Sequence, residues 1–142
     1  MWKINIRMNT SYKIIKEYGL LVQKYTGIFC FDELFDHIKI VVADPDWKNV
    51  GKIITDLRDI DMNVFHENMD FFLKYRNDNI KNSYLNVFIV DKPLPTAIVH
   101  MYKEQLNSEK YKYEYCSTVG YALSFLGLVG FEEEIGSVLD EL

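Results

Sequence analysis

The sequence is poor in cysteine and proline and has no long apolar run, and these absences exclude several classes of protein. Its two cysteines, Cys30 and Cys116, lie far apart in the chain. A domain of 142 residues buries enough surface to fold without disulfides, so we expect two reduced thiols. No stretch approaches the ~18–20 apolar residues of a membrane-spanning helix, and residues 1–10 lack the apolar segment of a signal peptide. The sequence therefore predicts a cytoplasmic protein with no membrane span.

Positive charge is also scarce. The 16 lysines and arginines are outnumbered by 21 aspartates and glutamates, which gives a net charge of −5. Nucleic-acid-binding domains usually carry a positive surface, so this balance argues against a nucleic-acid partner. Because 49% of the residues are hydrophobic and the composition does not shift along the chain, we expect one folded domain over residues 1–142.

The sequence motifs of common enzymes are missing as well. None of the seven glycines belongs to a nucleophile elbow, a phosphate-binding loop or a dinucleotide-binding fingerprint. His66 has no second histidine or cysteine near it in sequence to complete a zinc-ligand set, and His37 and His100 are interpreted as surface or partly packed residues. We therefore expect a non-enzymatic protein that holds no cofactor and no metal.

Strand and helix patterns alternate along the chain. The β-rich stretches on either side of Gly19 predict an opening hairpin, at residues 12–15 and 20–25. Apolar residues at three- and four-residue spacing predict a helix from Phe31 to the break at Asp44-Pro45. The same patterns predict strands at residues 52–57, 84–90 and 111–116, helices at 67–79, 97–106 and 119–126, an acidic turn at 59–61 and an amphipathic tail at 131–142.

The predicted order, β-β-α-β-α-β-α-β-α, is typical of an α/β domain. Because crossovers between parallel strands are right-handed, we expect helices packed on a four- to five-stranded mixed sheet, with the opening hairpin as its antiparallel pair. The amphipathic tail either packs on its own domain or docks into a second copy to form a homodimer.

Three short motifs resemble the STAS-like domains of bacteria, a family named for sulfate transporters and anti-sigma-factor antagonists. The chain has an opening hairpin that ends in Gly27, a helix that ends at Asp44-Pro45, and a strand that ends in Asp56-Leu57-Arg58. The resemblance covers about residues 12–127 and is closest to the small stand-alone members. It implies a mixed sheet with helices on its faces, and a role in binding a protein or a small ligand.

Signalling members of that family carry a phosphorylatable serine or threonine where a helix begins after the third strand. The corresponding stretch here, residues 61–67, has no hydroxyl side chain. A switch that works by adding charge therefore lacks its acceptor at that position. The resemblance then implies a regulatory or scaffold-type protein-binding domain, in a pathway that the sequence does not name.

The segment that follows the third predicted strand is the predicted partner-binding surface. Arg58 would supply a forked donor, Phe65 an apolar anchor and His66 a polar contact, beside Asp56 and Asp59. The two acids together with His66 would also suit a divalent metal in an enzyme, although Arg58 breaks the two-aspartate spacing of phosphotransfer sites. In a purely structural interpretation, the acids form a turn and pair with Arg58.

A second candidate site lies on the last predicted strand. Tyr111, Tyr113 and Tyr115 alternate along it, so the three rings share one face. They either fill the core or line an apolar pocket or a partner surface. The alternative function is therefore the binding of a small apolar, lipid-like ligand between the sheet and its helices.

Overall fold

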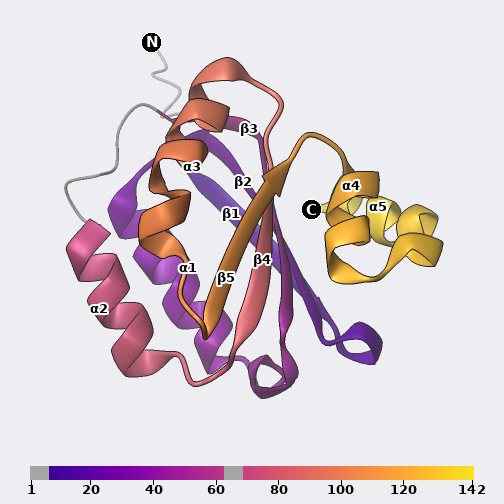
Figure 1. Ribbon diagram of the computed structural model, residues 1–142, viewed down its shortest axis with the longest axis horizontal. Helices are drawn as coiled ribbons and strands as arrows, with labels where there is room; N and C mark the ends of the chain where they lie inside the picture. Colours follow the sequence, from indigo (N-terminus) through magenta and orange to yellow (C-terminus); the bar gives the residue numbers. More distant parts are fainter. Residues whose placement is uncertain (1–6, 63–68) are drawn as a thin grey trace, which may run out of the picture.

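The computed structural model describes residues 7–62 and 69–142, which form a mixed five-stranded sheet flanked by helices (Figure 1). β1 and β2 are antiparallel, and each later strand is parallel to the one before it. This arrangement confirms the predicted α/β fold, with the opening hairpin as the antiparallel pair. The strands lie in chain order across the sheet: β1 (Asn9–Ile15), β2 (Leu20–Ile28), β3 (Lys52–Asp61), β4 (Tyr84–Ile89) and β5 (Tyr111–Cys116).

Helices cover both faces of the sheet. The parallel strands are connected by α1 (Phe31–Ala43), α2 (Met69–Asn79) and α3 (Pro93–Leu106). Because each parallel strand is added on the same side of the previous one, right-handed crossovers place all three helices on one face, to the left in Figure 1. α4 (Val119–Leu126) and α5 (Glu132–Glu141) lie on the opposite face. The sheet therefore separates two apolar cores.

The hairpin turn is a short 3-10 helix, Lys16–Tyr18, which ends at Gly19 with a φ of 58°. Glycine adopts this left-handed conformation without the clash that a Cβ atom would cause. The Gly19 carbonyl accepts hydrogen bonds from the backbone N–H groups of Gly51 and Lys52, so the turn is tied to the start of β3. The hairpin is thus where the sequence predicted it, with longer strands.

β3 continues through the segment that was predicted to be an acidic turn. The pairing of β2 with β3 shifts register between Lys24 and Thr26, as happens at a β-bulge. A bulge adds a residue to one strand without ending it, so Leu57 and Ile60 both reach the core beneath α1–α3 while Asp59 stays exposed. The turn prediction is wrong because alternating acids also suit the solvent side of a strand.

The C-terminal tail is a regular helix that packs on its own domain. Ile135 and Leu139 of α5 are 0% and 1% exposed, within the core between α4, α5 and the sheet. The Ser11 hydroxyl of β1 donates a hydrogen bond to the Leu142 carbonyl, which places the end of the chain beside the first strand. Of the helices described, none is long and apolar enough to cross a bilayer.

Candidate functional site

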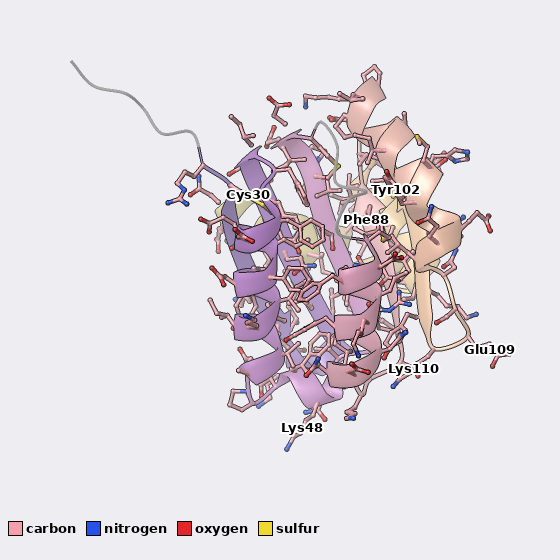
Figure 2. The ribbon with its side chains drawn as sticks, turned by 90° about the vertical axis from the view of Figure 1, so that its left-hand side faces the viewer. Cys30, Lys48, Phe88, Tyr102, Glu109 and Lys110 are labelled. Atoms are coloured by element: carbon pink, nitrogen blue, oxygen red, sulfur yellow. The ribbon has the colours of Figure 1, made fainter. Side chains whose placement is uncertain are left out.

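A cavity of about 130 Å³ lies between the sheet and the helices α1, α2 and α3. Its walls are mostly apolar and come from the inward faces of β2, β3, β4 and β5 and from all three helices. Figure 2 looks onto this layer from the helix side and labels two of the lining residues, Phe88 of β4 and Tyr102 of α3. The cavity therefore lies within the larger of the two cores.

Four polar side chains cross the floor of the cavity as one hydrogen-bonded chain. His37 of α1 donates through Nε2 to Gln23 Oε1 (2.7 Å), and Gln23 Nε2 donates to Thr55 Oγ1 (2.8 Å). The Thr55 hydroxyl then donates to Asn86 Oδ1 (2.9 Å). All four residues are buried and line the cavity. The chain satisfies polar groups that would otherwise be costly to bury, and it leaves the Asn86 amide nitrogen without a hydrogen-bond partner among the residues described.

His37 remains neutral in this environment. Burial lowers the pKa of its imidazole from 6.5 to about 4, because the charged form loses its hydration. The rings of Tyr12 and Tyr25 pack edge-on against the imidazole, with centroid distances of 5.8 and 5.2 Å. At neutral pH the side chain is therefore a hydrogen-bond donor to Gln23 and carries no charge.

The three tyrosines of β5 share one face, and the structure separates them by burial. Tyr111 and Tyr113 are each 3% exposed, which leaves neither available to a partner protein. Tyr113 lines the cavity, and its hydroxyl is hydrogen-bonded to that of Tyr84 on β4. Burial raises the pKa of both of these hydroxyls, so they remain protonated. Tyr115 is half-buried and pairs with His100 Nδ1 (2.6 Å) outside the cavity.

Asp56 and Arg58 are brought together in β3. The Asp56 side chain is 2% exposed and accepts two bonds from the Arg58 guanidinium, at 2.9 and 2.8 Å, and one from the Arg58 backbone N–H at 3.0 Å. Burial alone would raise the pKa of Asp56, but these hydrogen bonds and the positive charge hold it below its ordinary value. The pair is the ionic arrangement that the structural interpretation predicts.

The other residues of the predicted partner-binding surface do not join that pair. Asp59 is 63% exposed in its side chain and lies 3.9 Å from the Lys24 ammonium. Phe65 and His66 fall outside the described residues. Across residues 7–62 and 69–142, no three histidine, cysteine, aspartate or glutamate side chains are grouped to hold a metal ion. The partner-binding role of this surface stays a prediction.

The polar chain on the cavity floor was not predicted from the sequence, although a signal for it exists. Leu21, Gln23 and Tyr25 alternate along β2, so Gln23 is a polar residue at an inward position between two apolar ones. Asn86 occupies the same kind of position in the apolar strand β4. Inward polar residues on neighbouring buried strands must find hydrogen-bond partners, and this requirement would have pointed to the cavity.

No protein-family model matches the chain, and neither does any curated protein. The candidate site must therefore be judged on its own geometry. That geometry is a mostly apolar cavity with hydrogen-bonding groups restricted to the sheet side.

Proposed function

We propose that this protein binds a small, largely apolar molecule in the cavity between the sheet and α1, α2 and α3. The observation that carries the proposal is the volume of about 130 Å³ that the described side chains leave between the sheet and the three helices. Protein interiors pack as densely as organic crystals, and voids larger than a water molecule are few. At ~24 cal/mol per Å³, a cavity of this size costs roughly 3 kcal/mol of stability. A ligand that fills the volume removes that cost.

Over most of the wall, which is apolar, the chemistry favours an apolar occupant over water. A buried water molecule needs two to four polar partners, and the polar side chains of the floor mostly bond to one another. A cavity of ~150 Å³ lined by apolar side chains is known to stay dry and to admit benzene. We therefore expect a ligand about the size of one aromatic ring or a short branched alkyl chain.

Benzene is a suitable probe for this proposal. We expect it to raise the thermal unfolding midpoint of the wild-type protein and to show nuclear Overhauser contacts with methyl groups of the cavity wall. In the variant Val99→Phe, an added ring in the wall of the cavity should raise stability and abolish the benzene-dependent shift.

The matched control is Val129→Phe, the same change at a side chain that is 67% exposed on the far side of the sheet. This variant should keep the response to benzene. If benzene neither shifts the midpoint nor contacts the cavity methyl groups of the wild-type protein, the proposed function is wrong.

A second candidate, binding to another copy of the chain, is favoured by a different observation. Tyr121 and Phe125 of α4 and Val129 just after it are 65%, 47% and 67% exposed. Large apolar side chains grouped on a surface often mark an interaction site.

Sedimentation velocity over a range of concentrations tests this candidate. We expect Phe125→Ser to weaken self-association and Met101→Ser, at an exposed position on α3, to leave it unchanged. A wild-type protein that stays monomeric throughout contradicts this candidate.

A further inference from the structure

A buried arginine lies behind one corner of the cavity. Arg76 of α2 is 4% exposed, and its Nη1 atom donates to the Leu106 carbonyl (2.6 Å) and to the Tyr113 hydroxyl (3.2 Å). Its guanidinium carbon lies 4.4 Å from the centroid of the Tyr111 ring. Tyr113 and Leu106 both line the cavity, so the positive charge is one side chain away from the empty volume.

This charge has no counter-ion in the part of the chain that the structure describes. Across residues 7–62 and 69–142, no carboxylate lies within ion-pair distance of Arg76, and its Nε–H has no hydrogen-bond partner. A buried cation is normally paired with an acid, because an unpaired charge is costly to remove from water. The corner is therefore electrostatically incomplete without a negative group.

The two tyrosine hydroxyls next to Arg76 also have one donor too many. Tyr84 and Tyr113 form a single hydrogen bond with each other, and Tyr113 accepts another from Arg76. Two hydroxyl groups contain two O–H donors, and their mutual bond uses only one of them. Whichever hydroxyl donates in that bond, the O–H of the other is left without an acceptor among the residues described, at the wall of the cavity.

A third unused donor belongs to a neighbouring residue on the same face of the sheet. Asn86 is opposite Tyr113 in the pairing of β4 with β5, and it is two residues from Tyr84 on the same face of β4. Its Oδ1 atom accepts from Thr55, so its amide N–H groups are the part of the side chain that remains for a ligand. Within the described part of the chain, the lining residues Tyr84, Tyr113 and Asn86 thus have O–H and N–H donors that make no hydrogen bond to a described residue, and a positive charge lies nearby.

We infer that the ligand is a small apolar acid, whose carboxylate accepts hydrogen bonds from the Tyr84–Tyr113 pair and Asn86 and supplies the counter-charge for Arg76. The apolar part of the molecule occupies the rest of the cavity. This inference rests on the proposed function and adds the chemical class of the ligand to it. A carboxylate fits the corner because it is acceptor-only and charged, which matches a set of donors around a cation.

The test compares three probes of similar size: benzoate, its neutral analogue benzamide, and benzene. Each probe is titrated into the protein at neutral pH, and its dissociation constant is determined from the resulting changes in the nuclear magnetic resonance spectrum. We expect the wild-type protein to bind benzoate about tenfold or more tightly than benzamide, because hydrogen bonds to a charged group are the stronger ones. Arg76→Met should remove this preference while keeping the affinity for benzene, and Arg76→Lys should restore part of it.

Tyr113→Phe is the second variant, since it removes a hydroxyl and keeps the ring that packs beneath Arg76. It should weaken benzoate binding by about tenfold and change benzene binding little. If benzene binds while benzoate binds no better than benzamide, the inference about the acid is wrong and the proposed function stands. If none of the three probes binds, both fail. If benzoate is preferred equally by wild type and Arg76→Met, the assignment to this corner is wrong.

Discussion

At the scale of single residues, the Asp56 carboxylate depends chiefly on Arg58, with a smaller contribution from the charge of Lys24. Its side chain is 2% exposed, and the Arg58 side chain and backbone supply the three hydrogen bonds that it accepts from residues the structure describes. Arg58→Ala would leave a buried charge with a single backbone donor. We expect the free energy of unfolding to fall by roughly 2–3 kcal/mol, less than the ~3–5 kcal/mol typical of a fully buried pair because the Arg58 side chain is 30% exposed. Chemical denaturation at pH 7 measures the change.

Lys74→Ala is the control for that substitution. The ion pair of Lys74 with Asp78 has a similar length, 2.9 Å, but its two side chains are 77% and 58% exposed. Such pairs on helix surfaces contribute only ~0.3–0.5 kcal/mol. If the free energy of unfolding falls by the same amount in both variants, burial does not make the Asp56–Arg58 pair more stabilising than a surface pair. This comparison must also precede any partner-binding test of Arg58→Ala, because lost binding could then reflect lost stability.

His37 makes stability depend on pH in a defined window. Its pKa is lowered from 6.5 to about 4 in the folded protein, so the unfolded chain binds a proton between these values and the folded protein does not. The contribution of His37 to the free energy of unfolding is therefore fully present above pH 6.5 and is lost as the pH falls toward 4. We expect a loss of about 2 kcal/mol between pH 7 and pH 5. His37→Gln, which keeps a donor for Gln23, should flatten that part of the profile of unfolding free energy against pH. An unchanged profile would show that His37 is not buried in its neutral form.

At the scale of elements, two glycines should respond to the same substitution with opposite signs. Gly27 in β2 has a φ of 83°, and an added Cβ atom would lie 2.1 Å from the Arg7 carbonyl oxygen, so Gly27→Ala should cost more than about 1 kcal/mol. Gly136 lies within α5, and a Cβ atom added there would meet no packed neighbour within 4 Å among the residues described, so Gly136→Ala should add about 0.5–1 kcal/mol. Urea denaturation of both variants tests the prediction, and equal signs would contradict it.

The sequence predicted which helices and strands are present better than it predicted where they end or which residues form the candidate site. Hydrophobic periodicity located α1, and the Asp44-Pro45 break marked its C-terminus, because both signals are local. The extension of β3 depends on a bulge against β2, which is a property of pairing between distant segments. The polar chain on the cavity floor was missed for the same reason: Gln23, Thr55 and Asn86 are more than 30 residues apart in sequence and meet only when the sheet forms.

At the scale of the whole molecule, the two faces of the sheet are packed differently. On the face covered by α4 and α5, Ile135 and Leu139 are 0% and 1% exposed, and the strand residues beneath them are also buried. On the other face lies the cavity, and one of its walls is α2, where Met69 and Arg76 are the buried residues and Phe71 is 62% exposed. Stability should therefore be unevenly distributed, with α2 the least firmly held of the cavity walls.

Hydrogen exchange can detect this difference. We expect amides of α2 to exchange through local opening, with a free energy well below that of global unfolding, while amides of β4 exchange only when the whole domain unfolds. The matched reference is α5, which has 10 residues against 11 in α2 but has the buried Ile135 and Leu139. Because a ligand in the cavity would contact Met69 and Phe72 of α2, saturating benzene should slow exchange in α2 more than in α5. Equal protection of the two helices without ligand would show that α2 does not open separately.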